Sequence, residues 1–154
     1  MIYFSFEPPG SGSSWRDTWD KACKVSPAAI SEIDLCYKYF GVHVELVVDG
    51  VEVISGQGYL TLVDLALSLR HALNRLSSGE DSAIGFTEND EVIRLRREEN
   101  RVVITSSKHD WRVSADHEEL VGVFAEFLRE AHSCLIEFIP GLAVNPVIRG
   151  FSPE

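Results

Sequence analysis

Apolar side chains recur at helical spacing along residues 116–139, and this is the strongest pattern in the chain. The stripe consists of Leu120, Phe124, Phe127, Leu128, Ala131, Leu135 and Phe138. Because side chains three and four positions apart share one side of a helix, these residues predict a broad apolar face that packs on a sheet or another helix. Asp116 and Glu119 resemble a capping box at its start, and Pro140-Gly141 predicts its end.

Two further helices are predicted. Residues 61–76 carry a second apolar stripe, with Thr61 as the N-cap and Gly79 just beyond the end. A shorter helix begins after Ser14 as its cap, with Trp15 and Trp19 on one face. We expect these two tryptophans to attach the short helix to a sheet, because aromatic rings dominate core burial.

Alternating apolar and polar positions predict the strands. Residues 2–6 form a short strand, and residues 33–54 are interpreted as strand with a bend at Gly41. Asp49-Gly50 between valine-rich arms is a hairpin signal, because both turn positions favour positive φ. Four more short strands follow, at 83–87, 91–97, 101–106 and 109–114, and their spacing predicts an antiparallel meander.

These elements predict one α+β domain over residues 1–154, with residues 140–154 an irregular C-terminal tail. We expect a single antiparallel sheet of about six or seven strands, packed by two main helices plus one short helix. The length of 154 residues suits one domain and is short for two.

Acidic residues outnumber basic ones, 24 to 14, which gives a formal net charge of -10. This charge disfavours nucleic acid as a partner and favours a basic protein, although it also serves solubility alone. The N-terminus has no positive region followed by a long apolar core, and no apolar run reaches the length of a membrane helix. With an odd number of cysteines (Cys23, Cys36 and Cys134), the chain is expected to be cytoplasmic and not associated with membranes.

No catalytic, metal or cofactor motif is complete. His117-Glu118-Glu119 lacks the second histidine of a zinc-protease helix, since that position is Val121. His117 and His132 lie too far apart on one helix to share a metal, and His109 beside Asp110 has no identifiable nucleophile. We therefore expect no cofactor and no catalytic residues, and an enzyme is not the favoured interpretation.

The basic side chains Arg94, Arg96, Arg97 and Arg101 cluster in one predicted hairpin. They could bind a phosphate or carboxylate, but Glu98 and Glu99 in the same turn favour local neutralisation.

An acidic stripe on the helix at 116–139 is the leading candidate for a partner-binding surface. It consists of Glu119, Glu126, Glu130 and Glu137, with Val123 as an apolar neighbour. Residues 116–139 hold six acidic side chains and one basic one, whereas a solvated helix usually mixes signs to form i,i+4 pairs. The stripe is either such a binding surface for a basic protein or an ordinary solvated face.

The order of segments GVHVELVVDGVEV, TLVDLALSL, DWRVSAD and FAEFLREAHSCL resembles small, acidic, largely uncharacterised bacterial α+β proteins. Some of these resemble the immunity proteins of polymorphic toxin systems. The resemblance covers roughly residues 33–139 and is one of pattern, so it carries over no catalytic residue. It implies a non-enzymatic protein of immunity or antitoxin type that binds and neutralises a basic toxin.

Two other functions fit the sequence. A pocket between sheet and helices, lined by Tyr37, Tyr39, Trp111 and His43, would make the protein a small-molecule binder or an enzyme. Alternatively, an exposed strand edge or the aromatic N-terminus could form a structural homodimer.

Overall fold

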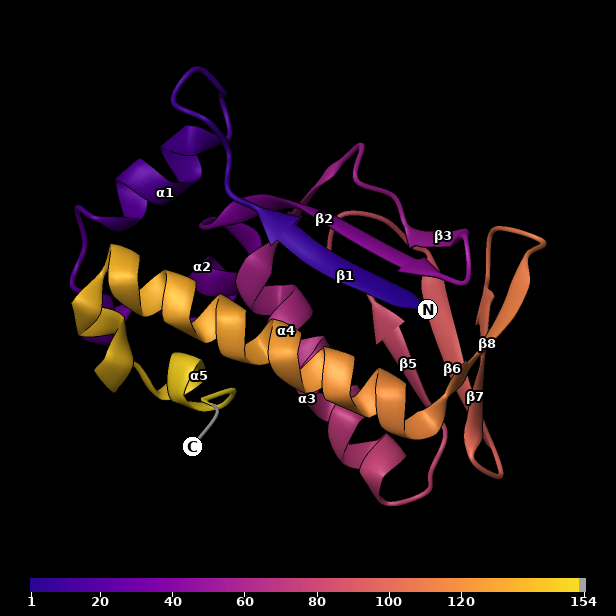
Figure 1. The fold of residues 1–154 in the computed structure, drawn as a ribbon. Coiled ribbons are helices and arrows are strands. Elements are labelled where there is room, and N and C mark those ends of the chain that lie inside the picture. Colours follow the sequence, from indigo (N-terminus) through magenta and orange to yellow (C-terminus); the bar gives the residue numbers. More distant parts are fainter. Residues whose placement is uncertain (153–154) are drawn as a thin grey trace.

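Two four-stranded antiparallel sheets form the framework of the computed structural model, which describes residues 1–152 (Figure 1). Sheet A contains β1 (Ile2–Glu7), β2 (Gly41–Val48), β3 (Val51–Ile54) and β4 (Tyr59–Thr61). Sheet B contains β5 (Ser82–Gly85), β6 (Val92–Glu98), β7 (Arg101–Ser106) and β8 (Arg112–Asp116).

Helices and 3-10 turns complete the chain. They are α1 (Arg16–Ala22), η1 (Pro27–Ala29), α2 (Glu32–Tyr37), α3 (Leu62–Ser77), α4 (His117–Phe138), η2 (Pro140–Val144) and α5 (Pro146–Arg149). Figure 1 shows α4 running diagonally below and in front of β1, with α3 behind it and sheet B at the far end from α1.

The α+β class and the antiparallel pairing are confirmed, but the expectation of a single sheet of six or seven strands is wrong. In sheet A, β2 is central and pairs with β1 on one edge and with β3 and β4 on the other. Sheet B is the expected meander β5-β6-β7-β8. The chain passes from one sheet to the other through α3, which lies between β4 and β5 in the sequence, so these strands are not joined as a hairpin.

Part of the strand predicted over residues 33–54 is helical instead. Residues 32–37 form α2, because the Ser31 hydroxyl accepts a hydrogen bond from the Asp34 N–H (3.2 Å) and starts a helix. Leu35 and Cys36 are adjacent and both buried, whereas Ile33 is 70% exposed. The alternation of apolar residues predicted a strand here, but an N-cap and a one-turn helix fit the same residues.

The Asp49-Gly50 hairpin is confirmed, with φ of 47° at Asp49 and 84° at Gly50. Helices α3 and α4 are also confirmed within a residue or two. The Asp116 carboxylate caps α4 by accepting from the Glu119 N–H (3.0 Å). Thr61 occupies the N-cap position of α3, but its side chain makes no capping bond, because its hydroxyl donates to the Cys36 carbonyl (2.7 Å).

Helix α1 begins one residue later than expected, since Trp15 is its N-cap residue and Ser14 makes no side-chain capping bond. Trp19 is 1% exposed and its indole N–H donates to the Gly41 carbonyl (2.8 Å). Trp15 lies on the ring of Tyr59, with 4.8 Å between centroids. Both tryptophans therefore attach α1 to sheet A, as the sequence predicted.

The segment after α4 contains the short helices η2 and α5 within the predicted irregular tail. Leu142, Ile148 and Phe151 are fully buried there, and residues 153 and 154 lie outside the described residues. Asn145 holds this segment in place. Its amide donates to the carbonyls of Pro27 (2.8 Å) and Ile30 (3.1 Å) and its side-chain oxygen caps α5.

Candidate functional site

An open groove of about 790 Å³ lies between the C-terminal half of α4, the end of β1 and α1. Its acidic wall is formed by Glu126, Glu130 and Glu137 of α4. Ser5 and Phe6 of β1 border the opposite side. The apolar stripe of α4 packs in the core and therefore fixes the orientation of the helix about its own axis. This orientation places the acidic side of α4 next to β1 and so positions the groove.

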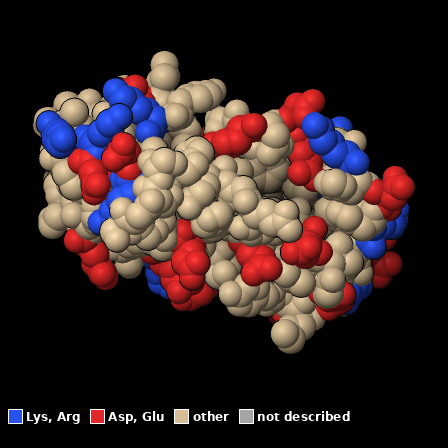
Figure 2. Space-filling view, turned by 90° about the horizontal axis from the view of Figure 1, so that it is seen from above, with Lys and Arg blue, Asp and Glu red and all other residues tan. Residues whose placement is uncertain are grey.

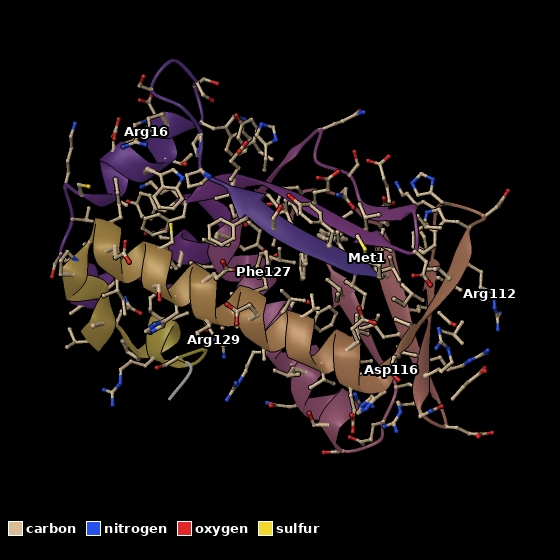
Figure 3. The ribbon with its side chains drawn as sticks, in the orientation of Figure 1. Met1, Arg16, Arg112, Asp116, Phe127 and Arg129 are labelled. Atoms are coloured by element: carbon tan, nitrogen blue, oxygen red, sulfur yellow. The ribbon has the colours of Figure 1, made fainter. Side chains whose placement is uncertain are left out.

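Aromatic rings hold α4 against the strand. Phe127 is 1% exposed and stacks on Phe4, with centroids 4.1 Å apart and an interplanar angle of 17°. Phe6 meets the same ring edge-on at 5.3 Å. Figure 3 shows Phe127 on α4 just below β1. These contacts make the strand side of the groove a packed aromatic wall.

Helix α1 closes one end of the groove. Trp19 and Arg16 line it, and the Arg16 guanidinium lies 5.4 Å from the centroid of Phe138. Arg16 also approaches Asp20 at 3.4 Å across one helical turn. Figure 3 shows Arg16 on α1, above the C-terminal half of α4. This end of the groove is therefore partly neutralised.

The acidic wall keeps two carboxylates without a partner. Glu126 forms an ion pair with Arg129 one turn along α4. Within residues 1–152, Glu130 and Glu137 take part in no ion pair. Both are exposed and lie seven residues apart, so they project from the same side of the helix two turns apart. They present two negative charges along the groove.

Two residues of the predicted stripe do not reach the groove lining. Glu119 lies in the first turn of α4, at the other end of the helix, where its N–H is capped by Asp116. Val123 is half-buried in the next turn. The structure thus brings together Glu126, Glu130 and Glu137 and separates Glu119 and Val123 from them. Arg129 of α4 also lines the groove. Arg16, Ser5 and Phe6 line it from other elements and were missed, because no local signal relates them to α4.

Charge is unevenly distributed over the face seen in Figure 2. Lysine and arginine gather mainly towards the two ends of the molecule, while the middle is largely uncharged with separate acidic patches.

The structure divides the predicted arginine cluster. Arg97 lies against the end of α3, donating to the carbonyls of Leu76 (3.3 Å) and Glu99 (3.0 Å). Arg101 is bonded to the hydroxyl and the carbonyl of Ser114. The guanidinium groups of Arg97 and Arg101 are therefore engaged in hydrogen bonds within the fold.

The remaining arginines lie on the outer face of sheet B. Arg94 and Arg112 both pair across strands with Thr105, so they share one face, and Arg96 is two positions from Arg94. Arg96 is paired with Glu98, as the predicted neutralisation requires. Figure 3 shows Arg112 projecting away from the helices.

The histidines are dispersed. The ring Nε2 of His117 lies 2.9 Å from the Leu76 carbonyl, and His109 lies 3.9 Å from Glu91. His132 meets the Phe151 ring edge-on at 6.1 Å, and burial lowers the pKa of its imidazole. Among residues 1–152, no three His, Cys, Asp or Glu side chains are grouped to hold a metal ion.

Burial affects two of the three thiols, those of Cys36 and Cys134. Burial, followed by the charge of Asp64, raises the pKa of Cys36 to about 11. Burial and then Glu137 raise the pKa of Cys134, which lines the groove. Since a thiolate is the reactive form, both thiols are held in the less reactive protonated state.

A partly exposed acidic junction joins the two sheets and was not predicted from the sequence. The Glu88 carboxylate, just after β5, accepts from the Thr61 N–H at the end of β4 (3.0 Å) and from the Thr87 hydroxyl (2.8 Å). Burial first, and the charge of Glu88 second, raise the pKa of Asp64 to about 6. The carboxylates come from segments distant in the sequence, so only folding reveals the pair.

The side chains of the alternative pocket are not brought together. Tyr37 is 67% exposed on α2, and Tyr39 is 3% exposed and borders a small depression beside α2. His43 lies on the outer face of sheet A, with its ring 3.9 Å from that of Tyr59. Trp111 precedes β8 in the other sheet.

Comparison with known proteins finds no matching family model, no matching curated protein and no matching solved structure. Among the helices of the described residues, none has the length and apolar character needed to cross a membrane.

Proposed function

We propose that this chain is a non-enzymatic binding protein that captures a basic protein partner in the groove between α4, β1 and α1. The observation that carries this proposal is the pair Glu130 and Glu137, which form no ion pair among residues 1–152 and line a groove together with Phe6, Trp19 and Phe138. Glu126 and Glu130 lie four residues apart on α4, and like charges at that spacing cost free energy unless a partner or solvent compensates them. A basic partner gains both the charge contacts and the apolar surface of the groove.

Neutralisation of a basic toxin, in the manner of an immunity or antitoxin protein, is the specific role we favour. The net charge of -10 supports it by steering a basic partner towards the chain. The pattern resemblance to acidic immunity-type proteins supports it as well. Such a protein acts by occupying its partner, which requires no catalytic residue.

The experiment combines capture with charge reversal. Tagged protein is incubated with lysate of the encoding organism, and retained proteins are identified by mass spectrometry. We expect a basic protein that is retained by wild type and lost, at low salt, by the double variant Glu130→Lys with Glu137→Lys.

The matched control carries the same change of charge elsewhere, as Glu52→Lys with Asp110→Lys, two exposed carboxylates outside the groove. It should retain the partner. Co-expression of the wild type with the captured protein should also restore the growth of cells that this protein inhibits. Equal capture by the groove and control variants would refute the proposed site, and growth inhibition that persists would refute the neutralising role.

A further inference from the structure

The outer edge of β1 carries backbone groups that pair with nothing among residues 1–152. β1 pairs with β2 alone. The Asp49 N–H donates to the Met1 carbonyl (2.8 Å), which sets the phase of the ladder, because alternate residues of an antiparallel strand bond to opposite sides. The N–H and C=O groups of Ile2, Phe4 and Phe6 therefore point away from β2, and no hydrogen bond of the described residues occupies them.

The hairpin at the other edge of β2 gives the same phase. Val48 pairs with Val51 across the two-residue turn, so the backbone groups of Val48 are directed to β3. Val48 lies opposite Ile2, which consequently receives no bond from β2. The Asp49–Met1 hydrogen bond and the Val48–Val51 pair thus both direct the backbone groups of Ile2 away from β2, and Ile2 is the first residue of the row along this edge.

The groove borders the C-terminal end of this edge. Ser5 and Phe6 both line it, although the side chains of consecutive strand residues point to opposite faces. Both can line one groove only if the groove borders the edge of the strand, where the backbone is reached. The end of this edge is marked by Pro8-Pro9, beyond which the chain leaves the sheet.

A second hollow lies on the other side of the same strand. It has a volume of about 550 Å³ and includes Glu7, Glu45 and His43 on the outer face of sheet A. The edge of β1 is therefore flanked by Glu130 and Glu137 on one side and by Glu7 and Glu45 on the other. Carboxylates are present on both sides of a row of free backbone groups.

We infer that β1 is a docking edge for an extended basic segment of the partner, which adds to sheet A as a further strand. This inference rests on the proposed function and specifies its chemistry. The backbone of the segment pairs with Ile2, Phe4 and Phe6, and its alternating side chains enter the two acidic hollows. Basic residues on both faces of the segment are required, since both hollows are acidic.

The charge of the groove argues against a second copy as the occupant. Two copies paired through β1 would each bring a net charge of -10 and an acidic α4 to the same contact. Helix α4 also packs against β1 through Phe127, so only a groove remains between the helix and the edge of the strand. A single basic strand is not repelled by the acidic charge, and it does not bring a second α4 into the limited space beside the edge.

Hydrogen exchange of the full chain tests this arrangement at single amides. The probe is the peptide KKVTKKVT with blocked ends, whose lysines fall on both faces of an extended strand. We expect the amides of Phe4 and Phe6 to exchange at least tenfold more slowly with the peptide present. The Ser5 amide, already bonded to β2, should be protected in both states.

Two matched pairs separate backbone pairing from charge. The same peptide with every backbone amide N-methylated keeps its charge but has no N–H donor on either edge, so it should bind at least tenfold more weakly. Phe6→Pro removes one edge N–H, whereas Phe6→Ala removes the ring and keeps the N–H. The proline variant should lose more affinity than the alanine variant, provided that circular dichroism shows both to be folded.

The outcomes distinguish the inference from the proposed function. If the peptide binds through Glu130 and Glu137 while the Phe4 and Phe6 amides stay unprotected, the strand arrangement is overturned and the charge-based function stands. Protection without peptide, accompanied by a dimer in sedimentation, would assign the edge to a second copy. Absence of peptide binding overturns the docking edge, and the capture experiment then decides the proposed function separately.

Discussion

Sheets A and B both contain four antiparallel strands, but their solvent-facing strands carry very different side chains. The edge strand β1 of sheet A, IYFSFE, has one charge in six residues, while the edge strand β8 of sheet B, RVSAD, has two in five. Charged side chains on exposed strands are a common means of preventing unwanted pairing with other chains. The β8 edge of sheet B carries Arg112 and Asp116, whereas the β1 edge of sheet A has backbone groups without partners among residues 1–152, beside a groove lined by Glu130 and Glu137.

The charged surface of sheet B disfavours pairing with another chain, whereas the β1 edge of sheet A is suited to a partner. Arg94, Arg96 and Arg112 cover the outer face of sheet B with positive charge. The β1 edge instead offers free backbone groups and half-buried aromatic rings. Variants in both sheets test this difference, and the largest effect is expected at the contact that holds β1 against α4.

Phe127→Ala should have the largest effect on stability. The ring is 1% exposed and contacts both Phe4 and Phe6, so its removal leaves a cavity between α4 and β1. We expect the free energy of unfolding to fall by about 3–5 kcal/mol, measured by urea denaturation. Tyr3→Ala, at a residue 50% exposed on the other face of β1, is the control and should change it by less than about 0.5 kcal/mol.

Asn145→Ala should destabilise the C-terminal segment that supports the groove end of α4. The substitution leaves the carbonyls of Pro27 and Ile30 without their donor and removes the cap of α5. We expect a loss of about 2–3 kcal/mol in thermal or urea unfolding. Native-state hydrogen exchange should show faster opening of residues 140–149 than of sheet B. Uniform acceleration in both regions would show that they form one cooperative unit.

The junction between the sheets should make stability depend on pH. The pKa of Asp64 is raised from 3.8 to about 6, so between these values the folded chain holds a proton that the unfolded chain has released. Its contribution therefore stabilises the fold at low pH and is lost as pH rises through about 6. After allowance for solvent screening of a half-buried group, we expect a change of about 1 kcal/mol.

Asp64→Asn should remove this part of the pH dependence, as measured by urea denaturation at several pH values between about 4 and 7. The variant Asp110→Asn, at an exposed position, is the control and should keep the wild-type profile. Identical slopes in the Asp64 variant and the wild type would mean that the acidic junction does not couple folding to pH.

The smallest effect is expected on the outer face of sheet B. Arg94→Gln with Arg112→Gln removes two exposed charges that form no ion pair within residues 1–152. Stability should change by less than about 0.5 kcal/mol, and peptide binding at the β1 edge should stay within threefold of wild type. A tenfold loss of peptide affinity would place the docking surface on sheet B and reverse the comparison.

Strong periodicity and turn chemistry were sufficient for some elements. The stripes of α3 and α4 and the Asp49-Gly50 hairpin were predicted from local residues, because each is stabilised largely within its own segment. The short α2 was mistaken for a strand. Ile33, Leu35 and Tyr37 alternate as in a strand, but the helix that starts at the Ser31 cap buries Leu35 with Cys36 and leaves Ile33 and Tyr37 exposed.

The candidate site was predicted in part. Glu130 and Glu137 were singled out because too many like charges lie on one helix, and that signal is local. Their aromatic neighbours on β1 and Arg16, which closes the groove, were not predicted. Residues more than 100 positions apart show no recurring spacing that would relate them to one another. Thr61 shows the converse, because a tertiary contact with Cys36 takes its hydroxyl from the capping role that its position predicted.

The sequence by itself determined the class of fold, the two long helices, the meander and the acidic side of α4, because periodicity and charge are properties of neighbouring residues. Only the tertiary structure decided that the strands divide into two sheets and that β1 ends up at an edge. Strand order depends on which distant segments pair with β2, and no local pattern encodes that choice. The groove is likewise a tertiary feature, since it exists only where α4, β1 and α1 meet.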